Sequence, residues 1–258
     1  MLFDFTSDYT AQGPERFLAG YAGYLQADAL AQYEGLYRDG RVKHVCCVAH
    51  SRRKFVAASD AGDERASKAL EMIGRLYAVE RALPPLLLPS DDLTQRDQRR
   101  QREERRRQLR QRDAEPVWDE LLKWLGEQKP SVLPKSPLGS AIGYAWNNWA
   151  ALKRYLEQGF LALDNNLSER TLRVIALGRN AWGVIGSEVG GQTAAVLYSV
   201  VGTCKHLGID PFAYLRDALP GLFALGEAPT AGQLLDWLPD RWLSNRTRGQ
   251  PVRDATAR

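Results

Sequence analysis

The chain has 258 residues, 44% of them hydrophobic and 26% charged, and its formal net charge is +4. These values are typical of a soluble globular protein. Its three cysteines are too few for a disulfide framework, no apolar run approaches the roughly 18 residues of a membrane span, and the N-terminus does not resemble a signal peptide. We therefore expect a cytoplasmic protein without a membrane partner.

The first 50 residues predict strands alternating with helices. Apolar and polar residues alternate in the opening stretch, and "VCCVA" is a small apolar run that suits a strand buried on both faces. The expected order is a strand over 2–6, a helix from Pro14, a strand over 24–27, a helix over 29–37 and a strand over 45–49. This alternation favours an α/β fold.

Helical patterns dominate the rest of the chain. Residues 51–128 have helical spacing, and a proline-rich linker over 130–137 follows them. An amphipathic helix is expected over 142–156, then a short strand over 160–163. Further on, apolar spacing predicts a helix that ends near Gly208, and Asp210 with Pro211 is typical of a capped helix start. The tail after about Pro239 is polar, and we expect it to be mobile.

Basic charge is concentrated in residues 95–112, which hold nine arginines against three acidic residues. This surplus exceeds the net charge of the whole chain, so the basicity is local. A solvated charged helix is the commoner interpretation of such a run, and a contact with DNA is the alternative. A second cluster, Arg52, Arg53 and Lys54, leaves the same choice open between a solvated helix start and a phosphate contact.

Polar residues interrupt the apolar pattern in "LALDNNLSERTLRV", residues 161–174. Asn166 can cap a helix, with Glu169 as the third residue of a capping box. The alternative makes Glu169 a ligand for a divalent cation, because hard cations prefer oxygen ligands. Asp28 ends the expected strand over 24–27 and is either a turn residue or a second such ligand. Carboxylates from distant segments are typical of magnesium sites for phosphoryl transfer.

All cysteines and histidines lie in "HVCCVAH", residues 44–50, and "CKH", residues 204–206. The spacing lacks the C-x₂₋₄-C pattern of structural zinc sites. Adjacent Cys46 and Cys47 on a strand would point to opposite faces. We therefore interpret the cysteines as buried small residues, with a zinc site as the less favoured alternative.

Four blocks together resemble the transposases of the bacterial insertion sequence 66 family, in the same order and with similar spacing. The blocks are "CVAHSRRKF", "LPKSPLGSAIGYAWNNWAAL", "LDNNLSERTLRVIALGRN" and "GIDPFAYLRDAL". The resemblance extends from about Leu2 to about Trp242.

The resemblance implies a ribonuclease H-like core of the DDE type, in which two aspartates and a glutamate hold Mg²⁺ or Mn²⁺ for DNA strand cleavage and transfer. Carried over residue by residue, Asp28 matches the second aspartate and Glu169 the glutamate. It also implies insertion-sequence DNA ends as the partner, a homo-oligomer, a nucleoid-associated location and no small-molecule substrate. We expect DNA contacts from the following basic residues: Arg52, Arg53, Lys54, Arg170, Arg173 and Arg179. Cys47 and His50 match a recurrent block of the family without an assigned chemical role.

Two departures from the family pattern bear on activity. The first catalytic aspartate has no clear counterpart, and Asp4 is a weak substitute because it sits where the family has a later strand. The block "GRNAW", residues 178–182, lacks the lysine that the family has after Arg179. We therefore expect a truncated and catalytically incomplete transposase.

The expected fold class is α/β, with a ribonuclease H-like core that lacks its first strands and is interrupted by an all-helical insertion. The expected division is a first part of the core over 1–55, the insertion over 56–135, a second part of the core over 136–215, and a C-terminal helix and tail over 216–258. Two rival hypotheses stay open: a non-catalytic DNA-binding or oligomerising remnant, and a helical interaction protein without a nucleic-acid role.

Overall fold

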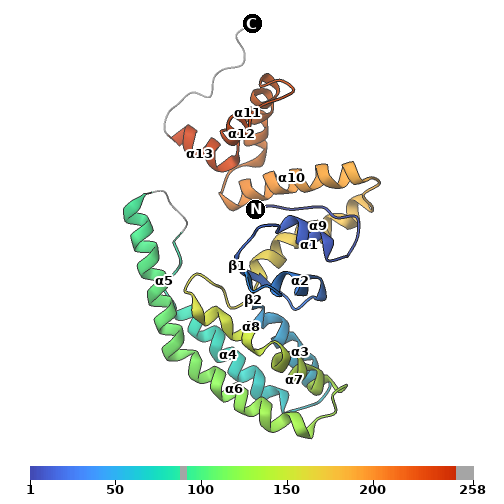
Figure 1. Ribbon diagram of the computed structural model, residues 1–258, viewed down its shortest axis with the longest axis vertical. Helices are drawn as coiled ribbons and strands as arrows, with labels where there is room; N and C mark the ends of the chain where they lie inside the picture. Colours follow the sequence, from blue (N-terminus) through green and yellow to red (C-terminus); the bar gives the residue numbers. More distant parts are fainter. Residues whose placement is uncertain (88–91, 248–258) are drawn as a thin grey trace. The chain divides into compact units, whose positions relative to one another are not determined.

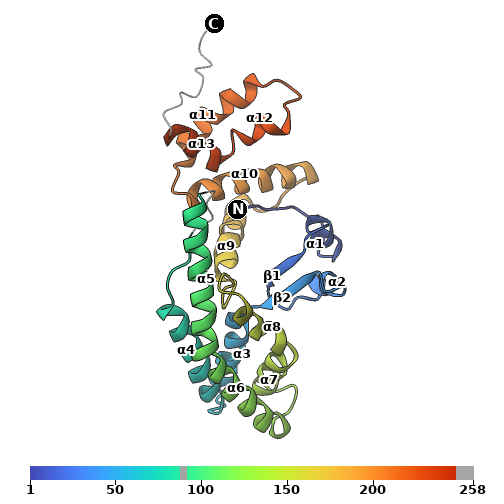
Figure 2. The ribbon, with the colours of Figure 1, turned by 60° about the vertical axis from the view of Figure 1, so that its left-hand side comes forward.

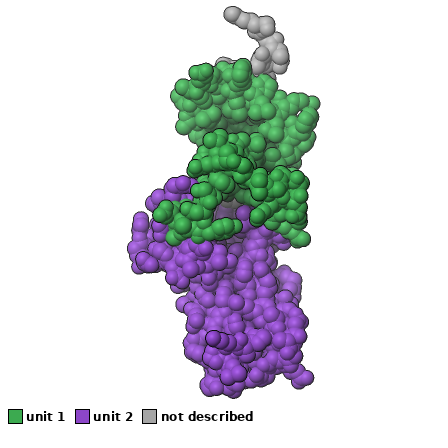
Figure 3. Space-filling model, turned by 90° about the vertical axis from the view of Figure 1, so that its right-hand side faces the viewer, with its two compact units in different colours: residues 1–13, 173–258 green, residues 14–172 purple. Residues whose placement is uncertain are grey.

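The computed structural model describes residues 1–87 and 92–247. It divides the chain into two compact units, which Figure 3 shows in different colours. The larger unit comprises residues 14–172, and the smaller unit comprises residues 1–13 and the chain from 173 onward. The described residues are mostly helical, with one two-stranded parallel sheet. None of their helices has both the length and the apolar character needed to cross a membrane.

The larger unit carries the sheet and most of the helices (Figure 1). Short 3₁₀ turns precede α2 and follow α6 and α8. Its elements in chain order are α1 (Gln12–Phe17), which begins just before it, β1 (Gly23–Ala27), α2 (Glu34–Tyr37), β2 (Val42–Cys46), α3 (Val48–Asp60), α4 (Ala66–Ala82), α5 (Leu93–Asp113), α6 (Glu115–Gln128), α7 (Pro137–Asn147) and α8 (Trp149–Lys153).

The two strands are parallel and lie side by side, with α2 in the connection between them (Figures 1 and 2). Gly23 pairs with Val42 at one end, and Ala27 pairs with Cys46 at the other. Because parallel strands run in the same direction, their carboxyl ends meet at one edge of the sheet. The residues that follow the strands, Asp28 and Cys47, are therefore brought to the same edge.

Three predicted strands need correction. Residues 2–6 form no strand, because the backbone N–H of Phe3 donates to the hydroxyl of Ser199 rather than to a neighbouring strand. Residues 160–163 form none either, since the carbonyls of Leu161 and Ala162 accept hydrogen bonds from side chains. The strand expected over 45–49 ends at Cys46, because α3 begins at Val48.

The expected helix over 142–156 is also interrupted. It divides at Asn148 into α7, α8 and a 3₁₀ turn over Arg154–Glu157. The side-chain amide of Asn148 donates to the carbonyl of Tyr144 at 2.9 Å. Local competition of this kind between side chain and backbone favours helix ends over helix interiors.

One hydrophobic cluster joins the sheet to the helices of the larger unit. Apolar residues recur every three or four positions along these helices, so each helix turns one stripe toward the common core. The fully buried members include Val45 and Cys46 of β2, Phe55 of α3, Met72 and Leu76 of α4, Trp118 and Leu125 of α6, and Ile142 of α7. The region predicted as a helical insertion, 56–135, therefore shares its core with β2 and α7.

The arginine-rich segment forms α5, and it is only in part the solvated helix that its composition predicts. Arg106 and Arg110 are buried, and Arg110 is 0% exposed. Arg110 forms a two-pronged ion pair with Glu80 of α4, at 2.7 and 2.8 Å. Buried arginines are rare unless each is paired, because the charge is costly to remove from water.

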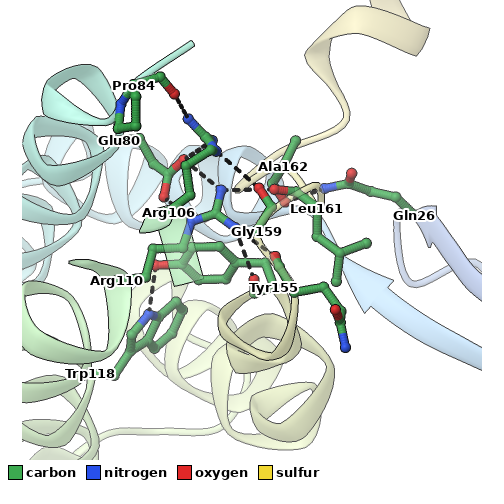
Figure 4. Close-up of polar contacts among 11 residues, drawn as sticks. Gln26, Glu80, Pro84, Arg106, Arg110, Trp118, Tyr155, Gly159, Leu161 and Ala162 are labelled. Carbon is green, nitrogen blue, oxygen red and sulfur yellow. Dashed lines mark hydrogen bonds and ion pairs between the residues drawn. The ribbon is translucent and has the colours of Figure 1, made fainter. Parts of the chain in front are cut away.

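The same two arginines also hold the segment that leads to the "DNN" motif (Figure 4). Arg110 donates to the carbonyls of Tyr155, Gln158 and Leu161 at 2.7 to 3.1 Å, and Arg106 donates to that of Gly159 at 2.9 Å. We call Glu80, Arg106 and Arg110 the buried clamp. It gives the backbone carbonyls of this segment buried side-chain donors.

The smaller unit is mostly helical over residues 173–247, whereas its residues 1–11 are irregular. It contains α9 (Asn166–Trp182) from residue 173 onward, α10 (Glu188–His206), α11 (Pro211–Ala224), α12 (Ala231–Leu235) and α13 (Pro239–Thr247). The predicted cap is confirmed: Asp210 accepts from the backbone N–H groups of Phe212 and Ala213. The polar tail is helical over Pro239–Thr247, and the rest of that prediction, from 248 onward, lies outside the described residues.

Candidate metal site at the ends of the parallel strands

The site is built at the carboxyl edge of the sheet. Asp28 follows β1 directly, and its side chain is 29% exposed. Cys47 follows β2 and occupies the N-cap position of α3. His50 and Arg53 lie on α3 within its first two turns, so one short segment brings a thiol, an imidazole and a guanidinium to this edge.

Glu169 reaches the site from the first turn of α9. The cap of this helix differs from the predicted one. Asn166 does not accept a capping bond; its backbone N–H and side-chain amide both donate to Asp164, at 3.1 and 2.7 Å. Asp164 also accepts from the hydroxyl of Tyr77 at 2.8 Å, and burial together with this bond raises the pKa of Tyr77. The helix that presents Glu169 is thus tied to α4.

His50 lies between the two predicted carboxylates. Its Nε2 lies 3.8 Å from Oδ2 of Asp28, and its Nδ1 lies 3.5 Å from Oε1 of Glu169. The guanidinium of Arg53 donates to Oε2 of Glu169 at 2.7 Å. The sequence motif contained His50 three residues after Cys47, yet its position between Asp28 and Glu169 becomes apparent only in three dimensions.

Three polar atoms of this cluster are buried without a hydrogen-bond partner in the described part of the chain: Nδ1 of His50, Oε1 of Glu169 and Oδ1 of Asn165. Leaving such atoms unpaired costs about 1–3 kcal/mol each. Two carboxylates, an amide oxygen and an imidazole are donors that suit a divalent cation. The oxygen donors at this edge suit by type the Mg²⁺ that the family resemblance implies. The ligand atoms that lie within 4.8 Å of one another in the described residues are those of Cys47, His50 and Glu169.

The adjacent cysteines have separate surroundings. Sγ of Cys46 lies 3.5 Å from the hydroxyl of Tyr144, whereas Sγ of Cys47 accepts from the backbone N–H of Asn165 at 3.4 Å. Both side chains are buried, and burial raises the pKa of each thiol. The ring of His44 stacks on that of Tyr37 with the ring centres 4.6 Å apart, and its Nε2 lies 3.3 Å from the carbonyl of Ala27, the residue before Asp28. The burial predicted for the cysteines is confirmed.

The basic residues expected to contact DNA have different environments. Arg52, Arg170, Arg173 and Arg179 are exposed. The exposed Arg53 is paired with Glu169, and the half-buried Lys54 lies 5.1 Å from the centre of the Tyr144 ring. Arg52 to Lys54 on α3 and Arg170 on α9 belong to the larger unit with the carboxylates, whereas Arg173 and Arg179 belong to the smaller unit.

Comparison with known proteins identifies the family. A sequence profile described as "Transposase IS66 family" matches residues 1–193. Two proteins of Sinorhizobium fredii are similar over most of the chain: Uncharacterized protein y4jD, 30% identical over 94% of this chain, and Uncharacterized protein y4hP, 31% identical over 92%. The chain covers 45% and 43% of their respective lengths. No solved structure matches. The chain belongs to the insertion sequence 66 family of transposases.

Proposed function

We propose that the chain serves DNA transposition through magnesium-dependent cleavage and transfer of DNA strands, with Asp28 and Glu169 as metal ligands in a ribonuclease H-like core. The observation that carries this proposal is that the two carboxylates, 141 positions apart in the sequence, both lie beside the imidazole of His50, one at each ring nitrogen. The matching transposase profile covers both residues and supports the assignment.

Asp28 and Glu169 would hold the magnesium, which would supply activation of an attacking water or DNA 3′-hydroxyl and stabilisation of the leaving oxygen in an in-line displacement. The chain's own residues prepare this chemistry. Asp28 and Glu169 offer oxygen ligands from two rigid elements, and His50 holds them near one another. Arg53 occupies Oε2 of Glu169, so Oε1 is the oxygen that remains for a cation.

Metal titration tests the proposal. We expect Mn²⁺ or Mg²⁺ to bind the chain with roughly micromolar to sub-millimolar affinity in isothermal titration calorimetry, and Glu169→Gln to weaken binding by more than about 100-fold, since even an indirect partner of a ligand is worth 10–100-fold. Glu71→Gln, on the exposed face of α4, is the control and should bind like the wild type. Equal binding by wild type and Glu169→Gln would refute the site.

None of the matched motifs supplies the first aspartate of the family. We therefore infer that the isolated chain holds metal without cutting DNA, and that cleavage needs a third carboxylate beside Asp28 and Glu169. The alternative function, DNA binding without catalysis, would then describe the isolated chain. Metal-dependent nicking by this chain that Asp28→Ala abolishes would contradict the inference.

DNA is the partner that fits the exposed cations of α3 and α9. We expect duplex DNA to bind with an affinity that falls steeply as salt rises, because each neutralised phosphate releases counterions. Arg52→Ala should reduce the slope of log K against log salt by about 1 in a fluorescence anisotropy titration. Arg107→Ala is the matched control, since Arg107 on α5 is engaged by Glu104 at 2.6 Å. If Arg52→Ala leaves the slope unchanged, Arg52 does not contact the DNA. The expected homo-oligomer at the DNA ends would then have to bind the phosphates through other residues.

A further inference from the structure

The cluster at the start of α3 contains a second set of ligands besides the two carboxylates. Cys47, His50 and Glu169 each offer one ligand atom, and the three atoms lie within 4.8 Å of one another. The ligand atoms on one tetrahedral Zn²⁺ are about 3.5 Å apart. Small side-chain movements would therefore allow all three atoms to bind one ion. We propose that Cys47, His50 and Glu169 form a binding site for Zn²⁺ that shares Glu169 with the magnesium site.

Unpaired atoms support the site independently of the ligand spacing. Nδ1 of His50 and Oε1 of Glu169 are buried, face one another at 3.5 Å, and have no hydrogen-bond partner among the described residues. A cation between them would satisfy both atoms at once. The donor set of one sulfur, one nitrogen and one oxygen suits Zn²⁺ better than Mg²⁺, because Mg²⁺ prefers oxygen and Zn²⁺ accepts thiolate and imidazole.

The groups around the ligands have the arrangement that zinc sites use. Nε2 of His50 faces Oδ2 of Asp28 at 3.8 Å, so the ring nitrogen that does not bind the metal has a carboxylate to orient it. In this mode Asp28 holds the imidazole rather than the ion. The fourth position of the tetrahedron is left for water.

The thiol of Cys47 must lose its proton for this mode. Its Sγ accepts from the backbone N–H of Asn165 at 3.4 Å, and Cys47 occupies the N-cap position of a 13-residue helix without a side-chain capping bond. Burial raises the pKa of this thiol, whereas backbone N–H groups of Asn165, His50 and Ala49 act in the opposite direction. Zn²⁺ displaces the proton into solvent and forms the Zn–S bond, while the N–H groups stabilise the thiolate.

The sharing of Glu169 gives the site a regulatory consequence, which rests on the proposed function. An ion held by Cys47, His50 and Glu169 removes one carboxylate from the magnesium site. Zn²⁺ would therefore inhibit by competition, and the thiol would set the preference for Zn²⁺ over Mg²⁺.

Cobalt substitution tests the zinc site directly. Co²⁺ bound to a thiolate shows a sulfur-to-cobalt charge-transfer band, and tetrahedral Co²⁺ shows strong visible bands. We expect both on adding Co²⁺ to the wild-type chain, and we expect Zn²⁺ to abolish them with one equivalent. Cys47→Ser should lose the charge-transfer band, and His50→Asn should weaken Co²⁺ binding by at least tenfold.

Cys46→Ser is the matched control, because Cys46 is the adjacent buried cysteine but contacts Tyr144 instead. It should keep both bands. Circular dichroism of each variant excludes unfolding, and Cys47→Ala is a second variant if Cys47→Ser unfolds. Absence of the charge-transfer band in the folded wild type, or its survival in folded Cys47 variants, would overturn the proposal.

The competition is measured by Mn²⁺ titration with and without one equivalent of Zn²⁺. We expect Zn²⁺ to weaken Mn²⁺ binding in the wild type and to have no effect in Cys47→Ser. Unaltered Mn²⁺ binding in the zinc-loaded wild type would overturn the sharing of Glu169. If Mn²⁺ fails to bind any variant, the proposed function fails, whereas the cobalt spectra still decide the zinc site.

Discussion

Replacing Arg110 by methionine is expected to lower the free energy of unfolding by about 3–5 kcal/mol, the cost of removing one partner from a buried ion pair. The side chain is 0% exposed and pairs with Glu80, which is itself only 15% exposed. Methionine would fill much of the volume but would leave Glu80 without its main partner. The carbonyls of Tyr155, Gln158 and Leu161 would also lose their donor. Urea denaturation followed by circular dichroism measures the change.

The control for this substitution is Arg107→Met on the same helix. Arg107 is paired with Glu104 near the surface, where water screens the interaction, so we expect little measurable change in stability. Both substitutions remove one positive charge from α5, so the comparison separates burial from charge. If both variants unfold at the same urea concentration as the wild type, the buried clamp does not contribute to stability.

Gly159→Ala is expected to destabilise the chain by about 3 kcal/mol or more, at the upper end of the range for overpacking. A methyl group at Gly159 would collide with the backbone of Glu103 on α5. Backbone atoms in a helix cannot move aside as a flexible side chain can, so the segment around Gly159 would have to leave α5. The bond from Arg106 to the carbonyl of Gly159 would be lost with it.

The same substitution at Gly74 should have the opposite sign. Gly74 lies in the middle of α4, and an added methyl group there would meet no other atom within 4 Å. Alanine is favoured over glycine in a helix interior by about 1 kcal/mol, so Gly74→Ala should raise the thermal midpoint. Differential scanning calorimetry of the two variants tests the pair. A loss of stability at Gly74 equal to that at Gly159 would show that the collision is not the cause.

Local patterns predicted much of the fold. The strand over 24–27, the helices of the region 51–128 and the cap at Asp210 follow from residue spacing and capping chemistry, which act within a few positions. The strands expected over 2–6 and 160–163 were wrong because their backbone groups bond to side chains distant in the sequence, such as Ser199 and Arg110. No periodicity within those segments contains that information.

The candidate site, too, was predictable from the sequence only in part. Family resemblance and residue type together selected Asp28 and Glu169, and the structure places each of them beside a ring nitrogen of His50. The position of His50 between them could not be predicted, because it depends on how β1, α3 and α9 meet. The burial of Arg110 could not be predicted for a different reason. Residues 95–112 contain nine arginines, and their composition does not indicate which of them is buried.

The buried clamp has a consequence for protein engineering and for the divergence of related chains. A helical insertion that made no specific contacts with the rest of the chain could be exchanged between related proteins as an independent unit. Here Glu80, Arg106 and Arg110 come from the helical region, and the backbone that they hold, residues 155–161, lies outside it. A chimera that replaces one side alone would bury an arginine opposite a mismatched loop. Successful exchange therefore requires both segments from the same parent.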